Sequence, residues 1–292
     1  MGEVVGAVGV PHHPNFPALA SEDTDFAREL HRLYGEVGKQ LKSVAPDVLV
    51  IVSSDHFHHY FAEVPTFGIG VAEETVGPCD RPDSPAYKMS VDSHLAGHIL
   101  CESVTAGFDV ARSHEFALDH AFVVPYHFLA AGLDVSIVPV FINGLLPPVP
   151  SAQRCFDIGQ TIRDAIESAD DGKRVAIVAS GTVSLDLGGI HDGPAEVHPS
   201  FQYEGVPDSA WVDEVVEHLS AGNVPGLVSG ATVGRMAGAG NIGAEFLNWI
   251  AMLGTFDAQA PEFVERQGPL GNVFAAWPLA QAAGQDIAGG TA

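Results

Sequence analysis

Two histidines and one glutamate are the residues of this chain whose types and positions best suit the binding of a transition metal. His12 lies in the sequence Val-Pro-His-His-Pro, His56 ends the sequence Ser-Ser-Asp-His, and Glu245 lies far along the chain in Gly-Ala-Glu-Phe-Leu. Two imidazoles and one carboxylate are the donor set of the non-haem Fe(II) oxygenases, which keep open positions for substrate and O₂. The three residues are therefore candidate Fe(II) ligands, although a lone histidine at a strand end is more often a hydrogen-bonded structural residue.

Each histidine closely follows an apolar run that is typical of a buried strand. Residues 4–10 precede His12, and residues 48–52 precede His56. Between these runs, residues 22–43 carry apolar side chains at helical spacing. This β-α-β order predicts a parallel pair of strands in a covered sheet. Both histidines then lie at the carboxyl edge of the sheet, where open α/β sheets bind their ligands.

The remaining hydrophobic patterns predict one α/β domain. We expect a mostly buried central mixed sheet flanked by helices, with the metal site at the C-terminal ends of strands, and we find no internal repeat or linker. The catalytic domain is expected to span residues 1–278, with a loosely ordered tail at 279–292. The further expected elements are strands at 67–71, 135–143 and 174–180, helices at 90–107, 154–169, 211–219 and 242–254, and a long loop at 186–210.

Composition excludes several classes of function. Of the 292 residues, 46% are hydrophobic, which is enough for a sizeable core, and the net charge is −24. So acidic a chain is a poor partner for nucleic acid or an anionic membrane surface. The three cysteines form no Cys-x-x-Cys pair, which argues against a disulfide framework or a structural zinc site. We see no secretory signal and no apolar run of membrane-spanning length, so we expect a cytoplasmic protein.

Five motifs in the same order along the chain resemble the class III extradiol ring-cleaving dioxygenases. That family includes the catalytic β subunit of protocatechuate 4,5-dioxygenase and 2,3-dihydroxyphenylpropionate 1,2-dioxygenase. The resemblance runs over almost the whole chain. The motifs are the His-x-Pro turn at His12, the strand ending in Asp-His at His56, Asp119-His120-Ala121-Phe122, the strand from Val138 to Gly144 followed by Gln153-Arg154, and the helix with Glu245 and Trp249.

The resemblance implies a reaction and a role for each motif residue. His12, His56 and Glu245 would bind Fe(II), and His120 would be the second-sphere histidine that handles protons near the bound diol. Imidazole suits that role because its pKa lies near neutrality. Both atoms of O₂ would enter an aromatic vicinal diol or an o-aminophenol, and the ring would open. The implied partners are this small aromatic substrate, O₂, and either further copies of the chain or a small companion subunit.

Leu185 departs from the family pattern. The family strand that ends in Gly-Ser/Thr-Gly-Gly-Leu/Met-Ser-His supplies another active-site histidine, and the equivalent stretch here runs from Ser180 to Leu185. Leucine can neither move a proton nor bind a polar group. His191 or Asp186 could take its place, the substrate could need one proton relay fewer, or ring cleavage could be lost while metal binding remains. We favour the first two, because the three ligands and His120 are present.

Other residues are candidates for the substrate pocket or its supports. His13 is expected to point away from the metal. Asp55 and Asp119 either orient loops or cap turns. Few cations are present to pair with a substrate carboxylate, and none is placed by a motif. The pocket candidates are His13, His58, His59, His127, Leu185 and His191, and the cations in or near loops are Arg81, Lys88, Arg112, Arg154 and Arg235.

Two other functions fit the same donor set. A zinc ion held by these residues would activate water for hydrolysis. Alternatively, the chain could be a non-catalytic family relative that acts as a binding module, which Leu185 would favour. Metal analysis and dependence on O₂ distinguish these functions from ring cleavage.

Overall fold

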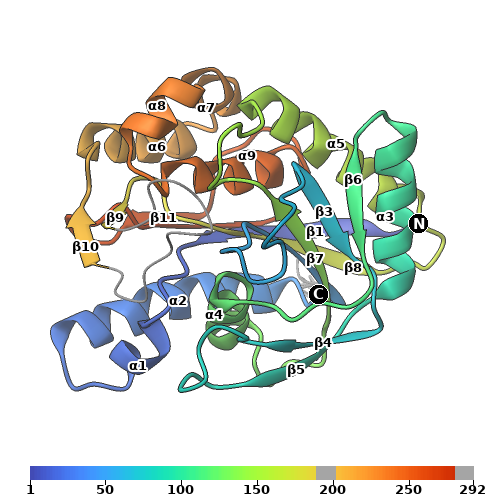
Figure 1. The fold of residues 1–292 in the computed structure, drawn as a ribbon, viewed down its shortest axis with the longest axis horizontal. Helices are drawn as coiled ribbons and strands as arrows, with labels where there is room; N and C mark the ends of the chain where they lie inside the picture. The colour runs from blue at the N-terminus through green and yellow to red at the C-terminus, as the bar shows by residue number, and fades with distance from the viewer. Residues whose placement is uncertain (189–201, 280–292) are drawn as a thin grey trace, which may run out of the picture.

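A mixed sheet forms the centre of the molecule (Figure 1). The computed structural model describes residues 1–188 and 202–279. Within them, eight strands lie in the order β11-β12-β1-β8-β2-β7-β3-β6. They are β1 (Glu3–Val10), β2 (Val48–Ser53), β3 (Phe67–Gly70), β6 (Val110–Ser113), β7 (Ser136–Ile142), β8 (Arg174–Ser180), β11 (Phe263–Arg266) and β12 (Val273–Pro278).

The four central strands run parallel, but the two strands that precede the histidines are not neighbours. β8 lies between β1 and β2 and pairs in parallel with both. The expected direct pairing of β1 with β2 is therefore wrong, although their shared direction is as predicted. The register places Val10 level with Ser180, and Val52 level with Ala179. The ends of all three strands consequently meet at one edge of the sheet.

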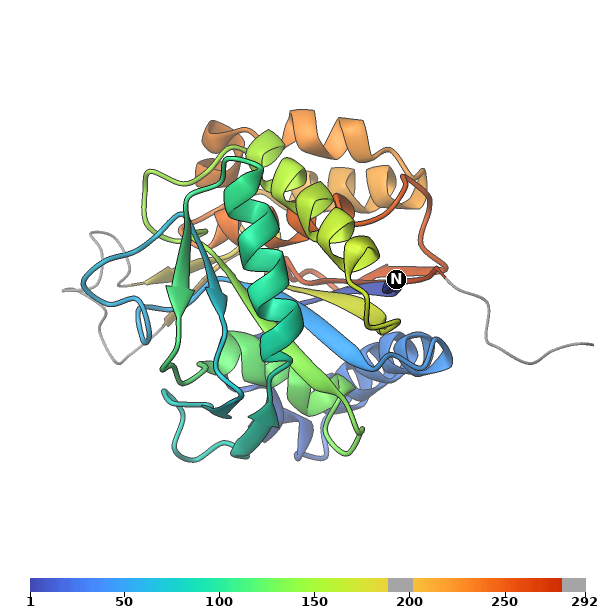
Figure 2. The same ribbon diagram turned by 90° about the vertical axis from the view of Figure 1, so that its right-hand side faces the viewer.

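Helices cover both faces of the sheet, as expected (Figures 1 and 2). Each helical layer packs on its own hydrophobic core. One face carries α1 (Phe16–Ala20), α2 (Asp25–Ser43) and α4 (His120–Leu129). The other face carries α3 (Ser93–Thr105), α5 (Ala152–Ser168), α6 (Ser209–Ser220), α7 (Val224–Gly230), α8 (Val233–Gly238) and α9 (Phe246–Leu253). No described helix is both long and apolar enough to cross a membrane.

Several elements differ from the sequence-based expectation. After β3, the structure contains a hairpin of β4 (Glu74–Gly77) and β5 (Tyr87–Ser90), two strands that are not among the expected elements. The expected loop at 186–210 includes the paired strands β9 (Asp186–Gly188) and β10 (Gln202–Gly205). The helix expected at 242–254 begins as a 3₁₀ turn, η2 (Gly243–Glu245), before α9. These elements are short, and pairing between distant residues stabilises the strands, so periodicity alone does not reveal them.

Trp249 of α9 packs directly on the backbone of β1. A Cβ atom added to Gly9 would lie 2.2 Å from the Trp249 ring. The indole Nε1 also donates a hydrogen bond of 3.0 Å to the Gly181 carbonyl, just after β8. Only glycine permits this approach, which fixes α9 against the strand ends that lead to His12.

We expect Gly9→Ala to lower the free energy of unfolding by about 1–3 kcal/mol, because the added methyl group overpacks a closed contact. Gly35→Ala is the matched control. Gly35 is exposed within α2, with no atom within 4 Å of an added Cβ, so this change should raise stability by roughly 0.5–1 kcal/mol. Urea denaturation measures both. Wild-type stability in Gly9→Ala would contradict the close packing of Trp249.

Candidate metal centre

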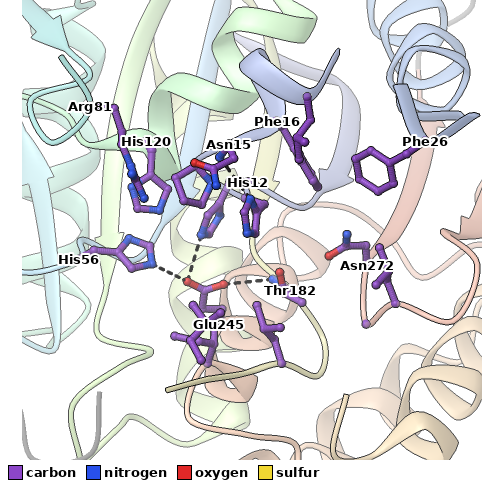
Figure 3. Close-up of a pocket in the computed structure, with 18 residues that line it drawn as sticks. His12, Asn15, Phe16, Phe26, His56, Arg81, His120, Thr182, Glu245 and Asn272 are labelled. Carbon is purple, nitrogen blue, oxygen red and sulfur yellow. Dashed lines mark hydrogen bonds and ion pairs between the residues drawn. The ribbon is translucent and has the colours of Figure 1, made fainter. Parts of the chain in front are cut away.

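The side chains of His12, His56 and Glu245 meet at the carboxyl edge of the sheet (Figure 3). His12 follows β1, His56 follows β2, and Glu245 ends η2 directly before α9. His12 Nε2 lies 3.1 Å from Glu245 Oε1, and His56 Nε2 lies 3.2 Å from the same oxygen. The glutamate side chain is fully buried, and the two imidazoles are only 5% and 9% exposed. The sequence predicted this meeting of three residues from three separate segments.

The Nδ1 atoms of His12 and His56 are both engaged in hydrogen bonds, which leaves Nε2 of each ring as the metal-binding atom. His12 Nδ1 is 2.8 Å from Ser180 Oγ, whose own hydrogen is donated to the Ala121 carbonyl at 2.6 Å. His12 Nδ1 must therefore be the donor to Ser180. His56 Nδ1 donates to the Asp119 carboxylate at 2.9 Å. Metal-binding histidines are commonly oriented in this way by a second shell of acceptors.

Glu245 Oε1 shows that these residues fit a metal ion. Its partner atom, Oε2, accepts a hydrogen bond of 3.1 Å from the Thr182 amide, whereas Oε1 is buried and receives none from the described residues. A positive charge is needed among the two ring nitrogens and this carboxylate oxygen, because a buried carboxylate without a partner is energetically costly. Atoms about 3 Å apart are also spaced like neighbouring ligands with metal bonds of about 2.0–2.2 Å.

The pKa values describe the same centre without metal. Burial raises the pKa of Glu245, but its interactions with His12 and His56 outweigh burial and lower it to about 2. Burial lowers the pKa of His56, but its hydrogen bond to Asp119 and the nearby negative charge of Glu245 prevail and raise it well above the ordinary 6.5. In the metal-free protein, a proton on His56 therefore supplies the positive charge that a divalent ion would replace.

His120 brings a third imidazole to this place. Ligand atoms of His12, His56 and His120 all lie within 4.8 Å of one another. His120 is the first residue of α4, and its Nδ1 donates to Asp80 Oδ2 at 2.5 Å. Its Nε2 is thus left for a ligand or a proton. Burial and the charge of His56 lower the pKa of His120 to about 4, so this imidazole is neutral at pH 7.

Asp80 was not predicted from the sequence. Its carboxylate accepts both the backbone amide of His120, at 2.9 Å, and the ring Nδ1. Asp80 lies in the Pro- and Gly-rich segment after β4, 40 residues before its partner. The only local signal is an acidic residue in a loop, and such residues are common. Long-range folding of this loop against the start of α4 creates the contact.

The two other aspartates near the histidines act differently. Asp119 caps α4 by accepting the Ala121 amide at 3.0 Å, and it also accepts the backbone amide and Nδ1 of His56. Orientation and capping, which we had set against each other, are therefore both performed by this residue. Asp55 accepts the amides of His58, His59 and Tyr60 at 2.9–3.1 Å, so it caps a turn.

A cavity of about 450 Å³ lies over the centre. His12, His56, His120 and Glu245 line it, while Phe16 and Phe26 stand on the far side from His56 in Figure 3. The other lining residues are His13, Pro14, Asn15, Leu19, Arg81, Thr182, Leu185, Leu187, Ile242, Leu270, Gly271 and Asn272. A volume of this size is typical of a small-molecule site.

The predicted pocket histidines differ in whether they line the cavity. His13, one of the pocket candidates, lines the cavity. His58 is 41% exposed in its side chain, His59 bonds Ser113 Oγ at 2.8 Å, and neither lines the cavity. His127 is also absent from the lining, because its Nδ1 pairs with the Tyr87 hydroxyl at 2.5 Å.

Leu185 makes its side of the cavity apolar. It packs with Leu187 near the buried side chain of Ile242, and all three line the cavity. Asp186, one candidate to replace the family's histidine, is not among the lining residues. His191, the other candidate, lies outside the described residues. Among the described residues, no side chain that could carry a proton therefore replaces the expected histidine at the Leu185 side of the cavity.

Comparisons with known proteins agree with this geometry. The family model described as the catalytic LigB subunit of aromatic ring-opening dioxygenase matches residues 6–276. A 2,3-dihydroxyphenylpropionate/2,3-dihydroxicinnamic acid 1,2-dioxygenase of Klebsiella pneumoniae is 31% identical over 53% of the chain and 49% of its own length. A protein of the same name from Cupriavidus necator is 30% identical over 72% of the chain and 61% of its own length. The chain thus spans only half to three-fifths of these relatives.

A solved structure resembles the whole chain in fold. It is the crystal structure of an uncharacterized protein from Escherichia coli K12, which has a TM-score of 0.56 and 16% identity. The match covers 94% of this chain and 99% of that one. At this identity the likeness concerns the fold alone.

We expect His12→Ala, His56→Ala and Glu245→Gln each to lower bound Fe(II) by at least roughly tenfold after anaerobic loading and desalting, because each removes a donor. Glutamine keeps an oxygen for the Thr182 amide, so that variant leaves the local fold intact. His120→Ala should retain iron. Metal analysis with circular dichroism as a fold control measures this. Full iron in Glu245→Gln, or its loss in His120→Ala, would contradict the ligand set.

Metal affinity should rise with pH, because the raised pKa of His56 means that a proton must leave before the ring binds metal. The dissociation constant for Fe(II) or Zn(II) should fall by up to about tenfold per pH unit between pH 6 and 8 if one proton is released. Asp119→Asn removes the carboxylate that raises this pKa and should flatten the dependence. Competition titration with a chelator measures it, and an affinity that does not change with pH would be inconsistent with a protonated His56.

Proposed function

Because the chain belongs to the family of catalytic LigB subunits of aromatic ring-opening dioxygenases, we propose that it is an Fe(II)-dependent extradiol dioxygenase. Its substrates would be aromatic vicinal diols or o-aminophenols, and O₂. The observation that carries the proposal is the buried Glu245 Oε1, which receives no hydrogen bond from the described residues and faces His12 and His56 at 3.1 and 3.2 Å. The names of the relatives support the same substrate class.

His12, His56 and Glu245 would hold the iron from the sheet edge and leave the cavity side open. When bound, Fe(II) would supply open coordination positions and the redox chemistry that joins a diol to O₂. Two neutral imidazoles and one carboxylate reduce the net charge of the site to about +1, which still favours loss of a proton from a diol hydroxyl. Ser180 and Asp119 fix both rings by their Nδ1 atoms, so the donors are oriented before metal arrives.

His120 would take the diol proton at Nε2. It is neutral and lines the cavity, and its Nδ1–H is held by Asp80 at 2.5 Å. The Asp80 carboxylate raises the pKa of His120 against the stronger effect of burial, so it stabilises the imidazolium that forms. This arrangement is a base oriented by a carboxylate. Asp80 is thus a positioning residue in the proposed reaction.

The Leu185 side of the cavity would receive only the apolar part of a substrate. Leucine carries no proton, so proton transfer falls to the His120 side of the described cavity. Water is also excluded more effectively by an apolar wall, which protects a reactive intermediate from side reactions. We further propose, from the family resemblance, that the chain assembles with copies of itself or with a small companion subunit.

We expect anaerobic loading with Fe(II), followed by catechol-type diols and air, to give a yellow ring-opened semialdehyde acid with one O₂ consumed per diol. Absorbance and an oxygen electrode measure this. His120→Ala should keep iron and lose roughly 100-fold or more in turnover. Turnover of a hydrolysable substrate without O₂ would favour a hydrolase. Iron-loaded protein that opens no diol and no aminophenol would contradict the proposed function.

A further inference from the structure

Among the described residues, Arg81 is the only lysine or arginine that lines the cavity. The whole chain has 13 Lys+Arg against 37 Asp+Glu, so a permanent positive charge at this place is unusual for its composition. Figure 3 shows the side chain alongside His120, at the metal-binding end of the cavity. It is 31% exposed and belongs to the loop between β4 and β5. Arg81 therefore meets whatever enters the cavity.

The guanidinium of Arg81 has donors to spare. Its Nε lies 3.8 Å from Asp80 Oδ2, beyond hydrogen-bond distance. That carboxylate already accepts two hydrogen bonds from His120, at 2.5 and 2.9 Å. Across residues 1–188 and 202–279, no acceptor takes a hydrogen bond from the terminal amino groups of Arg81. Asp80 thus holds the positive charge near the metal-binding end without satisfying its donors.

Other cations that the sequence left unplaced are already engaged. Lys88 pairs with Glu74 at 2.7 Å, and Arg235 pairs with Asp208 at 2.8 Å. The guanidinium of Arg154 lies over an aromatic ring, 4.7 Å from its centre. None of these three lines the cavity. Arg81 differs from them in having both access to the cavity and unused donors.

Among the described residues that line the cavity, no lysine or second arginine competes with Arg81. His13 also lines the cavity, but its Nδ1 already accepts a hydrogen bond of 3.2 Å from the Asn15 amide. The wall that includes Leu185 offers no charged or hydrogen-bonding side chain. Asn15, Thr182 and Asn272 also line the cavity, but within the described lining the permanent positive charge that would pair with an anionic group is that of Arg81.

We propose that Arg81 is a specificity-determining residue that binds a carboxylate on the diol substrate, an inference that rests on the ring-opening function proposed above. A guanidinium presents two parallel N–H groups that match the two oxygens of a carboxylate. With the diol at the metal ligands and the carboxylate at Arg81, the ring would bind in the cavity in a single orientation. The apolar edge of the ring then faces Leu185.

The test compares an acid with its uncharged isostere. The probes are 3-(2,3-dihydroxyphenyl)propionate and 3-(3,4-dihydroxyphenyl)propionate, each with its primary amide, so that the carboxylate is offered at two positions relative to the diol. Binding to metal-free protein is measured by anaerobic calorimetry, and kcat/KM is measured for the iron-loaded enzyme. Wild type should prefer at least one acid over its amide by roughly 10- to 100-fold, the range of a charge-assisted pair.

Arg81→Gln should abolish this preference, because the acid loses a charge-assisted pair and therefore far more affinity than the amide does. Arg81→Lys should keep only part of it, because an ammonium lacks the paired donors. Arg112→Gln is the matched control. Arg112 is exposed on β6 and its guanidinium lies 3.5 Å from the His114 ring, away from the cavity lining, so this variant should behave as wild type. An acid preference that persists in Arg81→Gln, or is missing from wild type for both isomers, would overturn the inference.

The two proposals fail in distinguishable ways. Ring opening of acid and amide alike, with no effect of Arg81→Gln, would overturn the role of Arg81 and leave the dioxygenase function standing. Tighter binding of an acid that depends on Arg81, combined with no ring opening of any diol, would support the anion site and overturn the function.

Discussion

The site depends on the mutual approach of two imidazole nitrogens and one carboxylate oxygen in a place that water barely reaches. His12 Nε2 and His56 Nε2 stand 3.1 and 3.2 Å from Glu245 Oε1. Such a group is unfavourable unless a positive charge lies among its atoms. A proton on His56 meets that need in the metal-free protein, and a divalent metal meets it better. Stability of the centre and binding of the metal are therefore two aspects of one electrostatic constraint.

The rest of the fold holds these three atoms in place. Strand β8 lies between the two histidine-bearing strands and supplies Ser180, which orients His12. The Trp249 ring presses on Gly9 and locks the helix that follows Glu245 against β1. Asp119 joins the start of α4 to His56, and Asp80 joins the β4–β5 loop to His120. Four elements far apart in sequence thus orient one group of donors.

The sequence predicted the strand ends well and the supporting shell poorly. The positions of His12 and His56 could be predicted because continuous apolar runs mark buried strands and their ends. Glu245 was a candidate carboxylate that the family motif supported, since nothing local distinguishes one glutamate beside an apolar segment. Asp80 was missed because its contact with His120 depends on the path of a long loop. Strand order was missed for the same reason, because pairing between distant strands leaves no periodic trace.

The polarity of the cavity extends the same reasoning to the substrate. The cation Arg81 lines one part of the cavity, and apolar side chains line the part around Leu185, the position at which the family resemblance implied a histidine. A ring that enters between these sides has a defined orientation relative to His120, the proposed base. Proton transfer and substrate orientation then depend on neighbouring residues, because Asp80 holds His120 and lies beside Arg81.

Anomalous diffraction from crystals loaded with Fe(II) under anaerobic conditions tests the central claim most directly. We predict one iron peak within about 2.2 Å of His12 Nε2, His56 Nε2 and Glu245 Oε1, with His120 outside bonding distance. A peak bound by the three imidazoles without Glu245, or no peak at this edge of the sheet, would contradict it.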